Sequence, residues 1–124
     1  MTKRILVIED NVQNLYLVTF LLEQSGYQVL QAKDGPAGIE LAAQNPPDMI
    51  LLDIQLPGMD GYEVAQTLRS HQILQAVPIV AVTSYAMVGD RERGLAAGCN
   101  GYIEKPINPD TFLDEIEQHF AENG

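Results

Sequence analysis

Ionisable and hydroxyl side chains follow short apolar runs at several places in this sequence. Glu9 and Asp10 come directly after the run at residues 5–8, and Asp53 comes directly after residues 49–52. If these runs are parallel strands, their carboxyl ends lie at one edge of a sheet, where ligands bind in open α/β folds. The spacing therefore predicts that the three carboxylates meet.

Two further apolar runs are followed by a hydroxyl side chain and by an ammonium side chain. Thr83 follows residues 79–82, and Lys105 lies just beyond the weaker run at residues 102–103. Each residue also has a simple structural explanation, because Thr83 could bond its own backbone and Asp10 or Asn11 could cap a helix. The convergence of four strand ends on one place favours a functional site instead.

Close carboxylates repel one another, and a single lysine cannot neutralise three of them, so the cluster calls for a cation. The ligands on offer are all oxygens, which favours a hard ion, Mg²⁺ or Mn²⁺. We expect it to be bound by Asp10, Asp53 and the backbone carbonyl of Gln55. Such a site suits phosphoryl transfer, with Asp53 as nucleophile, Lys105 offsetting oxygen charge and Thr83 donating a hydrogen bond.

The elements that would position these groups alternate between strand and helix. The strand pattern covers the runs already named, with an alternating edge strand at residues 27–32, and helical periodicity covers residues 12–24, 36–44, 61–70 and 87–97. A last helix is expected to start with Asn108 as its cap and Pro109 in its first turn. Right-handed crossovers then give an α/β fold, a doubly wound parallel sheet with helices on both faces.

In the first helix, the residues expected on the buried stripe are Val12, Leu15, Val18, Leu21 and Leu22. Ser25 and Gly26 are expected to end that helix.

The composition limits the classes of function. The chain has 124 residues, of which 46% are hydrophobic, and its 17 acidic and 7 basic residues give a net charge of −10. That length predicts one domain, residues 1–124. The charge disfavours nucleic acid and anionic membrane as partners. No signal peptide or membrane span is expected, which predicts a cytoplasmic protein. The lone Cys99 is expected to be a small buried residue.

Four motifs in order resemble those of the response-regulator receiver family, most closely its stand-alone regulators and the receivers of hybrid kinases. They are Glu9-Asp10-Asn11, residues 51–61, Thr83-Ser84 and Lys105-Pro106, with Ala86-Met87 and residues 98–107 also typical. The resemblance implies a flavodoxin-like five-stranded sheet of order 2-1-3-4-5 with five helices.

The resemblance also assigns roles to single residues. It implies Glu9 and Asp10 as the acid pair of the metal site, Asp53 as phosphoacceptor and Lys105 as the phosphate-binding cation. Thr83 and Tyr102 would be the switch residues. In the family the peptide bond between the lysine and the proline is usually cis.

The family implies a histidine kinase or histidine phosphotransfer protein as donor, and a downstream protein target on the fourth helix, fifth strand and fifth helix. The protein would catalyse only its own phosphorylation and dephosphorylation, and no output domain is expected after the last helix. Tyr85 and Gln55 would flank the path of attacking water and slow the loss of phosphate.

Several alternatives are weaker. An aspartyl-nucleophile phosphatase would need an acid where Gln55 stands, and Glu9 and Asp10 would repel the phosphate of a flavin. A receiver excised from a hybrid kinase stays open beside a stand-alone protein, although Met1 favours the latter.

Other residues are expected to have no part in the site. His71 and His119 are expected to be solvated, and Tyr16, Tyr27 and Tyr62 to be packing residues.

Overall fold

The computed structural model describes residues 2–56, 58–84 and 88–123, with side chains left out at 88–91 and 121–123. The sequence hypotheses on Tyr85, on Ala86 and Met87, and on Pro57 and Met1 therefore lie outside the described residues.

Strands and helices alternate along the described chain, with one short 3₁₀ helix, η1. Their bounds are β1 Arg4–Ile8, α1 Val12–Gln24, β2 Gln28–Ala32, α2 Gly35–Gln44, β3 Met49–Asp53, α3 Gly61–Ser70, η1 Gln72–Leu74, β4 Ile79–Thr83, α4 Val88–Ala96, β5 Gly101–Glu104 and α5 Phe112–Asn123. In the part of the chain that is described, no helix is long and apolar enough to cross a membrane.

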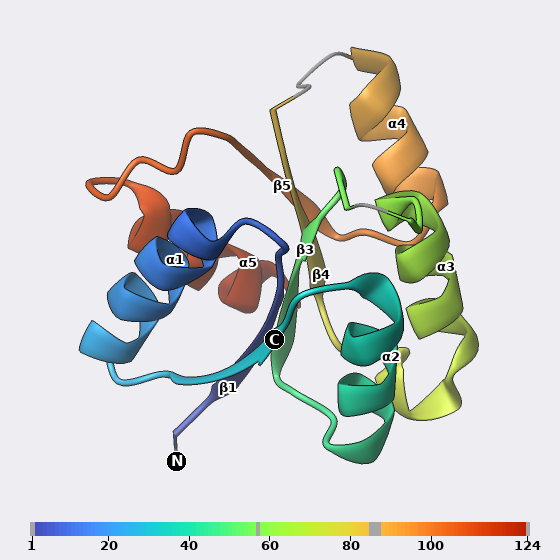
Figure 1. Cartoon of the computed structure of the whole chain (residues 1–124), viewed down its shortest axis with the longest axis horizontal. Coiled ribbons are helices and arrows are strands. Elements are labelled where there is room, and N and C mark those ends of the chain that lie inside the picture. The colour runs from blue at the N-terminus through green and yellow to red at the C-terminus, as the bar shows by residue number, and fades with distance from the viewer. Residues whose placement is uncertain (1, 57, 85–87, 124) are drawn as a thin grey trace.

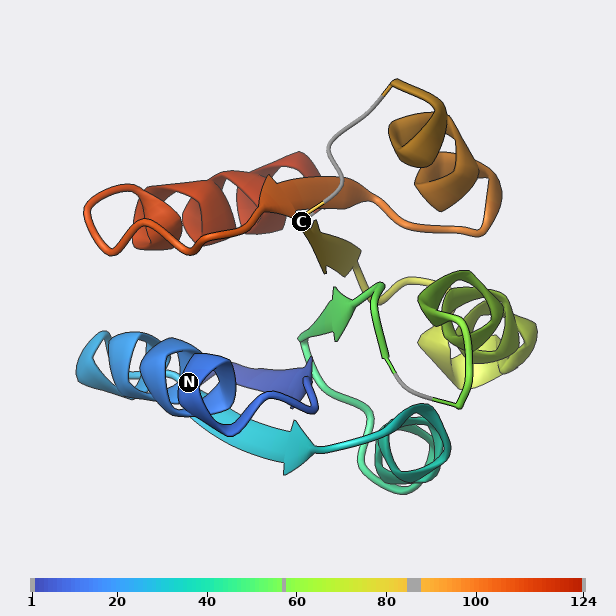
Figure 2. The ribbon, with the colours of Figure 1, turned by 45° about the horizontal axis from the view of Figure 1, so that its top comes forward.

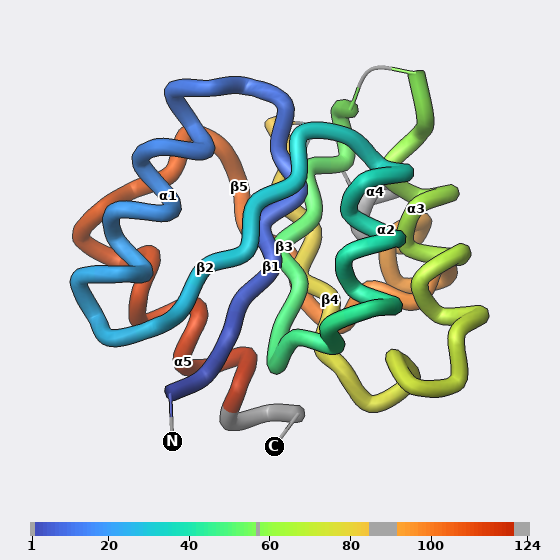
Figure 3. The backbone as a smooth tube through the Cα atoms, turned by 60° about the horizontal axis from the view of Figure 1, so that its bottom comes forward, coloured from blue at the N-terminus to red at the C-terminus, as the bar shows by residue number. Residues whose placement is uncertain are grey.

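The strands form one parallel five-stranded sheet in the order β2-β1-β3-β4-β5. Helices α1 and α5 cover one face, and α2, α3 and α4 cover the other (Figures 1 and 2). This confirms the expected doubly wound, flavodoxin-like architecture. The loops that leave β1, β2 and β3 lie together at one end of the sheet (Figure 3), and this is the edge at which the sequence predicts the site.

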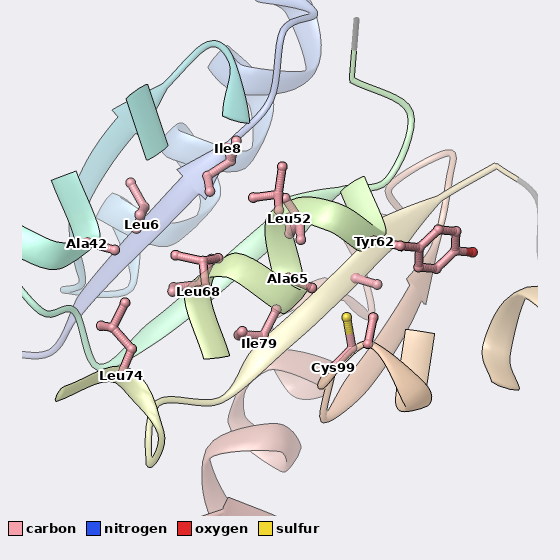
Figure 4. Packing of buried hydrophobic residues seen from close by; sticks show 14 of the residues in the cluster. Leu6, Ile8, Ala42, Leu52, Tyr62, Ala65, Leu68, Leu74, Ile79 and Cys99 are labelled. Atoms are coloured by element: carbon pink, nitrogen blue, oxygen red, sulfur yellow. The ribbon is translucent and has the colours of Figure 1, made fainter. Parts of the chain in front are cut away.

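The central strands are buried on both faces, as their continuous apolar runs predict. Every residue of β3 and β4 is buried, and so are four of the five residues of β1. On the α2 and α3 side, Leu6, Ile8, Leu52 and Ile79 pack with Leu68 (Figure 4). On the other side, α1 and α5 close a second apolar layer. The strands are therefore held firmly where their ends carry the polar groups.

Helix α1 begins and ends as its sequence predicts. The side chain of Asn11 caps it by accepting a hydrogen bond from the backbone of Asn14 at 2.9 Å. Gly26 follows its end with a φ of 91°, a left-handed conformation that favours glycine. Because Asn11 is the cap, the side chain of Asp10 is left for another role.

Two expectations about the helices are wrong. Helix α5 begins at Phe112 rather than near Asn108, because Asn108 first caps a separate turn, its side chain accepting from the backbone of Asp110 at 3.0 Å. Val12 is 68% exposed and so does not lie on the buried stripe of α1. It is the first residue of the helix and projects beyond the core.

Candidate functional site

The carboxyl end of β1 supplies two acids with different surroundings. Glu9 is buried, and its Oε2 accepts a hydrogen bond from the backbone of Asn11 at 3.2 Å. Asp10 is exposed. The turn into α1 therefore holds one carboxylate inside the edge of the sheet and presents the other to solvent.

The carboxyl end of β3 supplies Asp53, which is also buried. Its Oδ1 accepts from the backbone nitrogen of Gln55 at 2.9 Å. Helix α3 begins at Gly61, where a Cβ would overlap the backbone of Ile54. The glycine therefore allows the start of α3 to lie against the end of β3.

Lys105 joins the two buried acids. Its Nζ lies 3.2 Å from Oε1 of Glu9 and 3.1 Å from Oδ1 of Asp53, and its side chain is only 13% exposed. The peptide bond between Lys105 and Pro106 is cis. The backbone nitrogen of Lys105 donates to the carbonyl of Thr83 at 2.8 Å, which ties the end of β5 to the end of β4.

The three acids form a cluster that suits a metal ion. Glu9, Asp10 and Asp53 each offer a carboxylate oxygen, and these oxygens lie within 4.8 Å of one another. All the donors are hard oxygens, which fits Mg²⁺ or Mn²⁺ rather than a softer metal. The cluster is the one that the sequence predicts from the ends of β1 and β3.

The surroundings of Glu9 favour its protonated form. Burial, followed by the hydrogen bond and the negative charge of Asp53, raises the pKa of Glu9 from 4.5 to about 7. Lys105 acts in the opposite direction but is outweighed. At neutral pH a proton therefore occupies this site part of the time, and a divalent cation would take its place.

Thr83 and Tyr102 lie on neighbouring strands. Thr83 is buried at the end of β4, and Tyr102 on β5 pairs with Ala81. Because side chains alternate along a strand, Thr83 points to the same face of the sheet as Ala81 and Tyr102. The structure thus aligns the two expected switch residues on one face.

Tyr102 lines a cavity of about 260 Å³ between α4, β5 and α5, together with His119 and Cys99. A Cβ on Gly101 would overlap the His119 ring, so that ring packs closely over the backbone of β5. The expectation that His119 is solvated in polar surroundings is therefore wrong. Cys99 is buried, as expected, and burial raises the pKa of its thiol to about 11.

Two features escaped the sequence reasoning. Val12, Tyr16 and Phe20 form an exposed apolar stripe along α1, and the rings of Tyr16 and Phe20 stack with centroids 6.5 Å apart. Tyr16 is 72% exposed, so it is not the packing residue that was expected. The spacing of four residues was a readable signal for a second, outward face of the helix.

The second missed feature is a hydrogen bond between Ser84, which follows β4, and Gln55, which follows β3. The backbone nitrogen of Ser84 donates to Oε1 of Gln55 at 3.1 Å. From the sequence, Gln55 is expected to bind a cation through its backbone carbonyl and to flank the path of attacking water, whereas Ser84 stands only as part of the motif with Thr83. No local pattern predicts a hydrogen bond between residues so far apart in the chain.

The fold and the acidic cluster together define a flavodoxin-like protein with three carboxylates at the carboxyl edge of its sheet. The sequence of residues 5–117 matches the family model of the response regulator receiver domain, so the chain belongs to that family. Members of this family act in two-component signalling. Over 122 residues the chain is 40% identical to the polar-differentiation response regulator DivK of Brucella ovis, covering 98% of this chain and 99% of the relative.

Solved structures agree with this membership. The chemotaxis response regulator CheY4 of Vibrio cholerae superposes with a TM-score of 0.92 at 27% identity, covering 96% of this chain and 99% of that chain. The receiver domain of a sensor histidine kinase from Pseudomonas aeruginosa, solved with a magnesium ion coordinated in its active-site cleft, gives a TM-score of 0.89 at 33% identity, covering 98% and 99%.

Proposed function

We propose that this protein is a response regulator whose receiver domain, residues 1–124, accepts a phosphoryl group on Asp53 and changes its protein-binding surface in response. The observation that carries the proposal is the contact of one buried lysine with two buried acids, Lys105 with Glu9 and Asp53, inside a three-carboxylate cluster. A structural role alone would not bring together so much buried charge.

The donor would be a histidine kinase or a histidine phosphotransfer protein. A carboxylate oxygen of Asp53 attacks phosphorus, the bond between phosphorus and the imidazole nitrogen breaks, and its electron pair returns to the donor's ring. Lys105 offsets the charge on the phosphoryl oxygens, and the Thr83 hydroxyl donates to one of them. The chain acts only on its own Asp53.

Glu9, Asp10, Asp53 and the backbone carbonyl of Gln55 would hold Mg²⁺. When bound, the ion would supply charge stabilisation to the phosphoryl oxygens. The oxygen donors of this chain support the assignment, as does the magnesium in the Pseudomonas receiver.

The exposed stripe of Val12, Tyr16 and Phe20 would receive the phosphodonor. Val12 follows Asn11, whose backbone nitrogen binds Glu9, so the stripe runs directly up to the acidic cluster. A donor must bring its phosphohistidine to a buried Asp53, and a protein seated on this stripe is placed to do so. Its contact surface would be apolar, because an exposed aromatic stripe is stabilised by burial.

The output would be a contact with a downstream protein in the cytoplasm. Phosphorylation adds roughly −1.5 to −2 charge at Asp53. Thr83 would move toward the phosphoryl oxygens, and Tyr102 would turn into the space vacated. The surface of α4, β5 and α5 would then present a different shape to the partner.

The proposal is tested by phosphorylation with acetyl phosphate or a phosphohistidine protein in Mg²⁺. Wild type should gain an alkali-labile phosphoryl group on Asp53, and Asp53→Asn should gain none there. The matched control is Asp48→Asn, at the opposite end of β3, where Asp48 is exposed and accepts from the backbone of Arg4. Equal incorporation in wild type and Asp53→Asn would overturn the assignment.

A further inference from the structure

We infer that the side chain of Gln55 is a positioning residue that holds the Thr83–Ser84 segment in its resting place. The inference rests on the proposed function and adds to it a specific regulator of the switch. Its basis is the hydrogen bond from the backbone nitrogen of Ser84 to Oε1 of Gln55, 3.1 Å long, which we call the Gln55–Ser84 clasp.

Gln55 touches both parts of the switch. Its backbone nitrogen donates to Oδ1 of the acceptor Asp53 at 2.9 Å, while its side-chain oxygen accepts from Ser84. One residue thus joins the end of β3, where the phosphoryl group arrives, to the segment beyond β4 that must respond.

The clasp lies where the regular sheet ends. Val82 still accepts from the backbone of Ile54 at 3.1 Å, and Thr83 accepts from the backbone of Lys105 at 2.8 Å. The next backbone group along the chain, the nitrogen of Ser84, donates instead to a side chain. A bond to a half-buried side chain is exchanged more readily than a strand pairing, so movement of this segment begins at Ser84.

Movement of Thr83 toward Asp53 would carry the Ser84 amide with it. The clasp must then break. The free energy of this hydrogen bond stabilises the resting state and is lost on activation. Removing the acceptor oxygen of Gln55 should therefore shift the protein toward the activated arrangement before any phosphoryl group is present.

The probe is beryllofluoride, a mimic of the acyl phosphate, at saturating Mg²⁺. Gln55→Met keeps the length of the side chain and removes the amide acceptor. It should bind beryllofluoride about fivefold more tightly than wild type, since one neutral hydrogen bond is no longer lost on activation. The Ser84 amide should also lose hydrogen-exchange protection in the free variant, and Gln55→Glu, which retains an acceptor oxygen, should restore that protection.

Gln31→Met is the matched control, because Gln31 donates to Thr19 at the far edge of the sheet and should change neither property. Unchanged beryllofluoride affinity in Gln55→Met, or unchanged protection of Ser84, would overturn the inference. Failure of wild type to bind beryllofluoride at all would instead overturn the proposed function.

Discussion

The contacts of Lys105 in the acidic cluster and the contacts of Arg93 between α4 and α3 differ in how far the charged groups are buried. In the cluster, buried charges contact one another at 3.1 and 3.2 Å. On the α4 side, Arg93 lies 4.3 Å from the ring centroid of Tyr62 and 3.7 Å from Asp60, with side chains of Arg93 and Asp60 62% and 41% exposed.

These two arrangements carry very different energies. Removing one partner of a buried ion pair typically costs about 3–5 kcal/mol, whereas an exposed pair contributes about 0–1 kcal/mol. The described contact of Arg93 with Asp60 therefore holds α4 to α3 less firmly than Lys105 holds Glu9 and Asp53. If Asp53 is phosphorylated as we propose, we expect α4, which lies beside a cavity of about 260 Å³, to move more readily than the cluster.

The largest effect should come from Lys105. Lys105→Met should slow phosphorylation by acetyl phosphate by about a hundredfold or more, because the only lysine in contact with Glu9 and Asp53 among the described residues is lost. Initial rates at saturating Mg²⁺ measure this. The exposed Lys33, after β2, provides the control Lys33→Met. Similar rates in the two variants would show that the cluster does not depend on its buried cation.

A smaller effect on the rate of phosphorylation should come from the exposed stripe on α1. Substitutions there distinguish docking of the donor protein from the chemistry at Asp53. Tyr16→Ser combined with Phe20→Ser should slow transfer from a phosphohistidine protein by about tenfold, the loss expected when interface anchors are truncated. The rate with acetyl phosphate should not change. Ile73→Ser, at an exposed apolar residue of η1, is the control. Equal losses with both donors would place the stripe in the chemistry instead of in docking.

The smallest effect concerns the proton on Glu9 in metal-free protein. Its pKa is raised to about 7 in the folded state from 4.5. The folded state therefore binds more protons than the unfolded state in this interval, and the stability contributed by Glu9 is present at low pH and lost as the pH rises through about 7. Glu9→Gln removes that loss and should gain stability relative to wild type, on the order of 1 kcal/mol above neutral pH.

Denaturant unfolding at several pH values gives the difference between Glu9→Gln and wild type. The difference should grow as the pH rises from 4.5 to about 7, while wild-type affinity for Mg²⁺ strengthens over the same interval. Glu40→Gln, at an exposed position on α2, is the control. A difference that shrank with rising pH would contradict the account of Glu9.

Much of this arrangement was readable in the sequence. The apolar runs that precede Glu9, Asp53 and Thr83 indicate strands buried on both faces. Because a parallel sheet places the carboxyl ends of its strands at one edge, these local patterns are enough to predict that the three residues lie near one another. The stop at Ser25 and Gly26 and a cap at either Asp10 or Asn11 follow from local chemistry, and α1 has the predicted bounds, with Asn11 as its cap.

What the sequence did not predict depends on contacts between distant residues. Val12 has the periodicity of a buried position, and only the packing of α1 shows that it projects past the core. His119 lies over Gly101 because β5 and α5 pack together. The Gln55–Ser84 clasp likewise joins two loops that only the sheet brings side by side.

The most direct test of the proposed coupling between the acidic cluster and α4 is the map of backbone amide shifts on beryllofluoride binding. In wild type we expect changes around Asp53 and also across α4, β5 and α5. In Thr83→Ala the changes around Asp53 should persist, and those on the distant surface should disappear. Changes confined to α1, or distant changes that survive in Thr83→Ala, would contradict the account.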